Sequence, residues 1–175
     1  LHHYQAFYSC ISKNFNQNNI IVHCEGDGGV YNHAISKFNK SRGIELIKGT
    51  INFNLGRLYQ WTTLNLNMLP YHDEYKVMGL APYGKPLYTK EIKEKLIDIK
   101  DDGTFRLNMS YFKYHRGFRM TSQKFHKLFG SSPRNTEEEL TQFHMDLASS
   151  IQAVTEEIVI RIACALKNET GINNI

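Results

Sequence analysis

The strongest hydrophobic pattern lies near the end of the chain. From Leu140 to Leu166, apolar residues recur at steps of three and four, the spacing of one face of an α-helix. Thr136 and Glu139 precede this run and fit a capping box, and Gly171 is typical of a helix end. The pattern therefore predicts one long amphipathic helix between Thr136 and Gly171.

Shorter runs predict the remaining elements. Apolar residues spaced along a helix face favour helices, whereas short β-branched runs bounded by turn residues favour strands. These patterns predict helices at 3–15, 54–68, 88–99 and 122–130, and strands at 20–26, 30–39, 44–50 and 104–108. Tight turns join the first three strands, which predicts an antiparallel meander. Strands followed by helices predict a layered α/β or α+β domain.

The composition is that of a globular protein, with 41% hydrophobic and 22% charged residues among 175. The formal net charge is +4, but lysines and glutamates interleave over residues 90–95. That interleaving indicates a solvated helix face and argues against a nucleic-acid partner. Cys10, Cys24 and Cys164 have no paired spacing, so we expect reduced thiols and a cytoplasmic location. No apolar run is long enough to cross a bilayer, so we expect no membrane association.

Both termini look cut. The chain begins at Leu1 without a methionine, and it stops at Ile175 where a buried strand would be starting. We therefore expect it to be a piece of a longer protein.

A glycine-rich stretch, EGDGG at 25–29, follows the first predicted strand. Glycines at a strand end let backbone amides approach an anion, and nearby carboxylates can hold a metal that balances phosphate charge. The same stretch suits a hairpin turn, because Asp-Gly is a common hairpin signal. It is not a P-loop, since no Gly-Lys-Ser/Thr follows. The residues alone leave the phosphate loop and the hairpin turn open.

A second stretch, EYKVMGLAPYG at 74–84, joins two ions to a short apolar run. Lys76 can meet a phosphate as a point charge, with Glu74 orienting it. Gly79 allows close packing, and the Pro-Tyr-Gly at 82–84 makes a turn. A helix of one or two turns ended by the proline is the alternative. The residues alone favour neither.

Histidines and arginines supply two further candidates. His2 and His3 could ligate a divalent metal, but no partner follows at helical spacing, and a surface or tag pair is the alternative. His115, Arg116 and Arg119 lie among aromatic residues. This cluster suits either an anionic substrate or a surface loop anchored by its aromatic rings.

The long predicted helix carries two polar residues of interest, Asp146 and Gln152. A carboxylate on a helix is by default exposed to solvent. The alternative is that both residues face a cleft of the domain.

At EYKVMGLAPYG the sequence resembles the carbamoyltransferase family of nodulation and antibiotic-biosynthesis enzymes. Other segments resemble that family's motifs in the same order. HHYQAFYS resembles its His-rich motif, EGDGG its Asp-Gly-x-Gly motif, and NLGRLYQWTT its Ser-Leu-Gly-x-x-Tyr segment. DLASSIQAVTEEIV resembles the helix before its next glycine-rich strand. Together these segments cover nearly the whole chain.

The resemblance implies that residues 1–175 are part of the family's amino-terminal domain, truncated at both ends. That domain is Kae1-like, within the actin-like ATPase superfamily. The chain would form a ribonuclease-H-like half, with a mixed sheet that includes the meander and is packed by helices.

The resemblance also implies an activity shared between two domains. A YrdC-like domain, which this chain lacks, makes carbamoyl-adenylate from carbamoyl phosphate and ATP. The Kae1-like domain then moves the carbamoyl group to a hydroxyl of a small-molecule acceptor. A divalent metal, iron in a relative, lies between the reactants. We expect the isolated chain to be inactive, because the missing domain and further metal-binding motifs lie outside it.

Site residues follow from the resemblance position by position. It implies a nucleotide- or phosphate-binding set of Glu25, Gly26, Asp27, Gly28, Glu74, Lys76 and Gly84. It implies that His2 or His3 is the second histidine of a metal-binding His-x-x-x-His pair. Glu25 stands where Asp is usual and Asn54 where Ser is usual, so a carboxylate and a small polar group are kept.

Two alternatives keep the fold and change the function. One is a Kae1-like nucleotide-binding protein of tRNA threonylcarbamoyl modification, against which the wording of EYKVMGLAPYG and the scattered charge both argue. The other is a non-catalytic module that binds a nucleotide. Nucleotide binding without carbamoyl transfer would favour this module.

Overall fold

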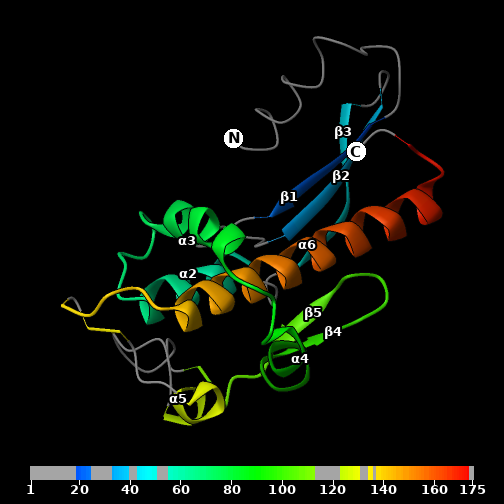
Figure 1. Cartoon of the computed structure of the whole chain (residues 1–175). Coiled ribbons are helices and arrows are strands. Elements are labelled where there is room, and N and C mark those ends of the chain that lie inside the picture. Colours follow the sequence, from blue (N-terminus) through cyan, green and yellow to red (C-terminus); the bar gives the residue numbers. More distant parts are fainter. Residues whose placement is uncertain are drawn as a thin grey trace.

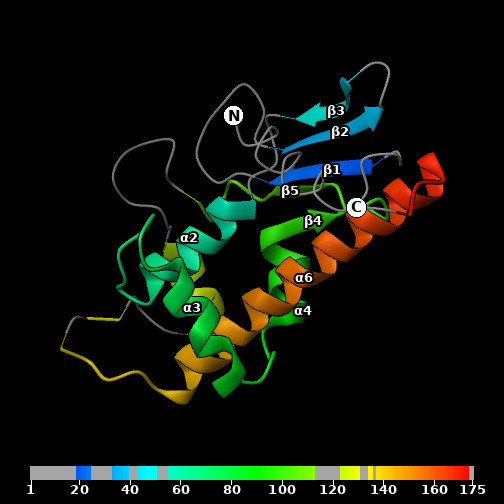
Figure 2. The ribbon, with the colours of Figure 1, turned by 90° about the horizontal axis from the view of Figure 1, so that it is seen from above.

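The computed structural model describes residues 19–24, 33–39, 43–50, 55–112, 123–130, 134–135 and 137–173. The elements, in chain order, are β1 (Asn19–Cys24), β2 (His33–Asn39), β3 (Gly43–Thr50), α2 (Leu55–Asn65), α3 (Glu74–Leu80), η1 (Ala81–Tyr83), α4 (Thr89–Glu91), η2 (Ile92–Leu96), β4 (Ile97–Ile99), β5 (Phe105–Leu107), α5 (Gln123–Phe129) and α6 (Gln142–Thr170). α6 runs through the middle of the molecule (Figure 1). α2 and α3 lie beside its N-terminal half, and the sheet of β1 to β3 lies beside its C-terminal half (Figures 1 and 2).

The predicted meander is confirmed. β1, β2 and β3 form an antiparallel sheet in that order, with Val22 opposite Ile35 and Phe38 opposite Ile44. A second antiparallel sheet of two short strands, β4 and β5, lies on the other side of α6 from α3 (Figure 1). The described part of the chain is therefore a mixed α/β arrangement.

The long helix is confirmed, but its predicted start is wrong. α6 begins at Gln142 because Thr141, not Thr136, is its N-cap. The backbone N–H of Thr141 donates to Nδ1 of His144 at 2.9 Å, which completes a capping box with histidine in the usual place of Glu. At the other end Gly171 adopts the predicted left-handed conformation, with φ of 69°.

The core lies where α6 meets α2 and the aromatic residues of the following segments. The apolar positions predicted for α6 are buried from Leu147 onward. On α2, Leu58 and Trp61 are buried, and Trp61 packs against Phe112 and Phe125. Burial of the predicted face is what holds α6, since an apolar stripe must be covered.

The helix predicted at 88–99 is too long. α4 and the π-helical η2 end at Leu96, and Ile97 starts β4. Asn108 explains the change, because its backbone N–H donates to the carbonyl of Leu96 at 2.8 Å and its side-chain amide to that of Lys95 at 2.9 Å. Those carbonyls need partners at a helix end, and Asn108 follows directly on β5.

Two shorter predictions are confirmed. The helix predicted at 122–130 is α5, followed by Gly130 with φ of 64°, and the strand predicted at 104–108 is β5. Within the described ranges, none of the helices combines the length and apolar character needed to cross a membrane.

Candidate functional site

The stretch EYKVMGLAPYG folds as α3 followed by the 3-10 turn η1, and both lie against α6. The backbone is therefore that of the alternative left open above, a short helix ended at the proline, and the binding role of the stretch stays a prediction. Val77 and Ala81 are buried, whereas Tyr75 and Met78 expose more than half of their side chains. Close packing predicted at Gly79 is wrong as far as the described residues show, because none has an atom within 4 Å of a Cβ built there.

Lys76 is held by Asp73 and not, as predicted, by Glu74. Its Nζ lies 2.9 Å from Oδ1 of Asp73 while 47% of its side chain stays exposed. The hydrogen bond with Lys76 lowers the pKa of Asp73, and the same bond raises the pKa of Lys76. The prediction failed because Asp73 is one helical turn before Lys76, whereas Glu74 is only two residues away and faces another direction. That i, i+3 spacing was a usable signal.

Glu74 instead fixes the turn before α3. Its Oε1 accepts a hydrogen bond from the backbone N–H of Tyr71 at 2.6 Å. Tyr71 has φ of 69°, an uncommon conformation for a residue with a side chain. Its hydroxyl accepts from Arg57 at 2.9 Å, so α2 and α3 both hold this residue in place. Oδ2 of Asp73 accepts from the N–H of Leu69 at 3.0 Å and closes the same turn.

Gly84 brings the chain into contact with the backbone of α6. A Cβ at this position would lie 2.0 Å from the carbonyl oxygen of Met145 and 2.6 Å from the nitrogen of Asp146. Its φ of −110° is open to any residue, so closeness alone requires glycine here. The family resemblance implies that Gly84 lies at a nucleotide site. The structure shows that Gly84 also packs directly against the backbone of α6.

The residues after Gly84 are hydrogen-bonded to α6. Oδ1 of Asp146 accepts from the backbone N–H of Lys85 at 2.8 Å and from the side-chain amide of Gln142 at 2.8 Å. The Lys85 bond is the main cause that lowers the pKa of Asp146, followed by the Gln142 bond. The hydroxyl of Ser150 accepts from the N–H of Tyr88 at 3.0 Å. Asp146 is buried, so the default expectation of an exposed carboxylate is wrong.

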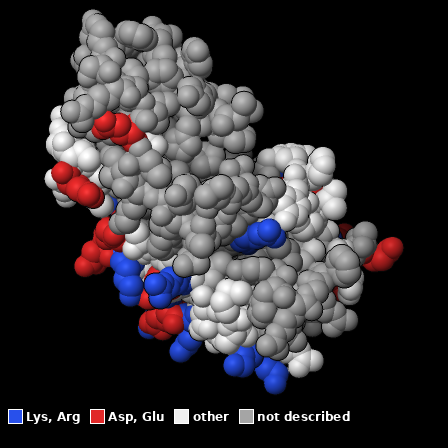
Figure 3. All heavy atoms as spheres, turned by 180° about the vertical axis from the view of Figure 1, so that it is seen from behind, with Lys and Arg blue, Asp and Glu red and all other residues white. Residues whose placement is uncertain are grey.

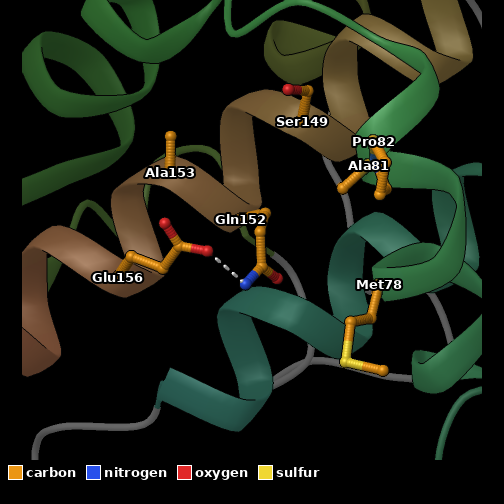
Figure 4. A pocket seen from close by; sticks show the side chains of 7 residues that line it. All are labelled: Met78, Ala81, Pro82, Ser149, Gln152, Ala153 and Glu156. Carbon is orange, nitrogen blue, oxygen red and sulfur yellow. Dashed lines mark hydrogen bonds between the residues drawn. The ribbon is translucent and has the colours of Figure 1, made fainter.

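A pocket of about 360 Å³ opens between the α3–η1 segment and α6 (Figure 4). Small-molecule pockets are typically roughly 300–1,000 Å³, so this one suits a small ligand. Ser149, Gln152, Ala153 and Glu156 line one side, at helix spacings of three and four. Met78, Ala81 and Pro82 of the motif line the other. Gln152 thus faces a cleft, which was the alternative to solvent exposure.

A polar chain links α2 to this pocket. The hydroxyl of Tyr59 donates to Oε1 of Gln152 at 2.8 Å, and Nε2 of Gln152 donates to Oε1 of Glu156 at 2.7 Å (Figure 4). Burial, and then the charge of Glu156, raise the pKa of Tyr59 to about 12. Tyr59 is 93 residues away from Gln152 in the sequence, so no local sequence pattern predicts these linked hydrogen bonds.

Several predicted site residues lie outside the described ranges. They are His2, His3, Glu25, Gly26, Asp27, Gly28, Asn54, His115, Arg116 and Arg119. Among the residues that the structure does describe, no group of three or more His, Cys, Asp or Glu side chains is placed to hold a metal ion. The metal pair and the EGDGG loop therefore stay predictions.

Charges of both signs are mixed on the surface. Seen from behind, Lys and Arg side chains lie directly beside Asp and Glu side chains along one edge (Figure 3). Lys93 and Arg161 both pair with Glu157, at 2.9 Å and 2.7 Å. Lys90 lies 3.9 Å from Glu94, as expected for a solvated helix face.

Comparison with known proteins identifies the family. The sequence profile described as "Carbamoyltransferase N-terminus" matches residues 2–175. This chain belongs to the carbamoyltransferase family. The family assignment predicted from EYKVMGLAPYG is therefore confirmed.

Three individual proteins are similar to parts of this chain. Over 122 residues, the chain is 48% identical to the uncharacterized protein sll1178 of Synechocystis sp., covering 70% of this chain and 20% of that protein. It is 26% identical over 174 residues to the nodulation protein NolNO of Sinorhizobium fredii, covering 99% and 24%. It is 29% identical over 103 residues to the nodulation protein NolO of Bradyrhizobium diazoefficiens, covering 59% and 17%. The chain thus spans no more than about a quarter of the length of these relatives.

Proposed function

We propose that this chain is part of an ATP-dependent O-carbamoyltransferase. The whole enzyme takes a carbamoyl group from carbamoyl phosphate, passes it through carbamoyl-adenylate, and delivers it to a hydroxyl of a small-molecule acceptor. The observation that carries this proposal is the family profile that matches residues 2–175. A YrdC-like domain elsewhere in the same polypeptide supplies the adenylate in this scheme.

The proposal includes a fold assignment. β1 to β3 and the helices after them belong to a ribonuclease-H-like half of a Kae1-like, actin-like ATPase domain. The antiparallel meander followed by helices supports that assignment. The EGDGG loop at 25–29 and the α3–η1 segment form two parts of the nucleotide site in this proposal.

Lys76 contributes charge at this site. Its ammonium is half exposed, and Asp73 fixes its position at 2.9 Å. A lysine held in this way can meet a phosphate oxygen as a point charge without reorganising in the reaction. Glu74 acts on Lys76 only indirectly, because it fixes the turn at Tyr71 that precedes α3.

The proposal also includes a divalent metal, iron by family resemblance, which His2 or His3 would bind. No step is assigned to it, because the described residues hold no cluster of metal-binding side chains.

The test is a transfer assay with the full-length protein. Carbamoyl phosphate labelled in its carbonyl carbon is supplied with ATP and a panel of hydroxylated acceptors. We expect ATP-dependent transfer of label to an acceptor hydroxyl, with formation of AMP. A preparation that turns over ATP but never labels an acceptor would contradict the proposal.

Variants at Lys76 test the site. Lys76→Met should lower kcat/KM for ATP by roughly 10- to 100-fold, because one charge on the phosphates is lost. Asp73→Asn keeps the lysine and should lower kcat/KM less. Lys90→Met is the matched control, since Lys90 is an exposed lysine with a distant partner at 3.9 Å. Full activity in Lys76→Met would remove Lys76 from the site.

A further inference from the structure

A histidine closes the N-terminal end of α6. Nδ1 of His144 accepts a hydrogen bond from the backbone N–H of Thr141 at 2.9 Å, and the backbone N–H of His144 donates to the side chain of Thr141. A backbone N–H can only donate, so Nδ1 must be unprotonated and the ring hydrogen lies on Nε2. The glutamate usual in this box stays an acceptor near neutral pH, whereas a histidine loses that ability when it takes up a proton.

Three features of this helix end oppose a charged imidazole ring. A proton on Nδ1 would point a donor at the N–H of Thr141, which is also a donor. A cation at a helix N-terminus meets the positive end of the helix dipole. His144 is also only 6% exposed, so a charge on it would lose its hydration.

The charged groups that act on His144 come from the segment before α6. Burial, and then the charge of Arg134, lower the pKa of His144, while Glu138 acts in the opposite direction. Among the described residues of the elements packed on α6, including Tyr83 and Lys85 beside it, none is a further cause of that shift. The state of the ring is therefore decided by its burial, by these two charges and by its place in the capping box.

The first turn of α6 supports the end of the motif EYKVMGLAPYG. The side-chain amide of Gln142 donates to the carbonyl of Tyr83 at 3.3 Å, and Oδ1 of Asp146 accepts from the backbone N–H of Lys85 at 2.8 Å. Between these two contacts, Gly84 lies directly against the backbone of the same helix. If this turn of α6 frays, the end of the motif loses all three supports together.

We propose that neutral His144 is a positioning residue, which fixes the end of the motif through the first turn of α6. Uptake of one proton by Nδ1 ends the contact with Thr141, the turn frays, and Gly84 and Lys85 move away from the helix. The motif is thus held near neutral pH and loosened in acid. An effect of this loosening on the use of ATP rests on the proposed function, whereas the loosening itself does not.

The direction and the size of the effect follow from linkage. The pKa of His144 is lowered in the folded state, so the capping box is fully stabilising above the unfolded value of 6.5, and this stabilisation is lost as pH falls through the folded pKa. At about pH 5.5, one unit below the unfolded value, the population of the frayed state can exceed that at about pH 7.5 by at most about tenfold.

Hydrogen exchange of the full-length protein, followed by mass spectrometry at about pH 7.5 and about pH 5.5, measures this population. The backbone N–H groups of Lys85 and Tyr88 both donate to side chains of α6, so they report whether the segment stays in place. After correction for the chemical exchange rate, we expect both to exchange several-fold, and at most about tenfold, faster at the lower pH. A peptide that contains Gly171, at the other end of α6, is the internal reference and should not change.

Variants connect the exchange to the ring of His144. His144→Gln keeps an acceptor in the capping box but does not titrate, so it should protect Lys85 equally at both pH values and as well as the wild type does at the higher one. His144→Leu has no acceptor, so Lys85 should exchange fast at both pH values. His72→Gln is the matched control, because His72 is an exposed histidine in the turn before α3, and it should keep the pH dependence of the wild type.

The exchange data can overturn the proposal in three ways. Exchange of Lys85 and Tyr88 that does not change with pH in the wild type would do so. A pH dependence that persists in His144→Gln, or that disappears in His72→Gln, would also do so, because another group would then be the one that titrates. Equal loosening at Gly171 would show that the whole fold opens and not the first turn of α6.

Carbamoyl transfer, measured in parallel, tests the positioning of the site for the reaction. Between about pH 7.5 and about pH 5.5, kcat/KM for ATP should fall more steeply in the wild type than in His144→Gln. Equal falls would remove His144 from the positioning of the site. Exchange that depends on pH as expected, in a protein that never transfers carbamoyl, would leave the capping role standing and refute the proposed function.

Discussion

Replacing Gly84 by alanine should destabilise the fold, because the new methyl group has no space. The Cβ would lie 2.0 Å from the carbonyl oxygen and 2.2 Å from the carbonyl carbon of Met145. Both atoms belong to the backbone of α6, a long helix that cannot bend away locally. The turn after η1 must therefore move off α6.

The size of the effect follows from what that movement disturbs. Forcing an extra methyl group into a packed contact costs about 1–3 kcal/mol. Moving the turn also weakens the hydrogen bond from the N–H of Tyr88 to Ser150, for about 0.5–1.5 kcal/mol more. The sum is about 1.5–4.5 kcal/mol in the free energy of unfolding. At about 2–4 °C per kcal/mol for a domain of this size, Tm should fall by roughly 3–18 °C.

Thermal unfolding followed by circular dichroism measures this, with Gly79→Ala as the matched control. Gly79 lies in α3 of the same motif, and no atom of a described residue is within 4 Å of a Cβ built there. Alanine in a helix interior gains up to about 1 kcal/mol over glycine, so Gly79→Ala should be neutral or slightly stabilising. An unchanged Tm in Gly84→Ala, or an equal loss in both variants, would refute the packing argument.

Three further results are expected. The pKa of Asp146 is lowered in the folded state, so the ionised carboxylate stabilises the fold above the unfolded pKa of 3.8, and this stabilisation is lost as pH falls through the folded pKa. Asp146→Asn should therefore flatten the acid limb of a Tm–pH profile. An unchanged acid limb would contradict this. The pKa of Tyr59 is raised to about 12, so the stability of the fold should decrease as pH rises from 10 toward 12. In Glu156→Gln the absorbance of the Tyr59 phenolate should appear at lower pH than in the wild type. An unshifted absorbance would exclude the charge of Glu156 as a cause of the raised pKa. Residues 1–175 alone should show no carbamoyl transfer, and any acceptor-dependent turnover by them would disprove this.

Much of the fold was predictable because local patterns decide it. The apolar stripe of α6, Gly171 at its end and the meander of β1 to β3 all depend on neighbours close in sequence. Boundaries were less predictable where distant groups decide them. η2 ends at Leu96 because Asn108 binds its last carbonyls, and α6 begins at Gln142 because Thr141 caps it in a capping box that has histidine in the usual place of Glu. Neither the contact of Asn108 with the end of η2 nor the use of histidine in the capping box can be recognised from a single sequence.

The candidate site divides in the same way. EYKVMGLAPYG was recognisable as one unit, yet the partner of Lys76 was misassigned although Asp73 stood one turn away. The roles of Asp146 and Ser150 depend on contacts 61 and 62 residues apart in the chain. Such contacts are fixed by how α3 and η1 lie on α6, which no local pattern specifies.

The motif therefore combines two tasks that mutation can separate. Val77, Ala81 and Gly84 face inward and fix α3 and η1 on α6, so changes there should lower Tm and distort the pocket together. Lys76 faces outward with half of its side chain exposed, so its loss should lower transfer while Tm stays nearly unchanged. If Lys76→Met lowered Tm as much as Gly84→Ala does, the lysine would be part of the docking contact, and its proposed place at a phosphate would lose its basis.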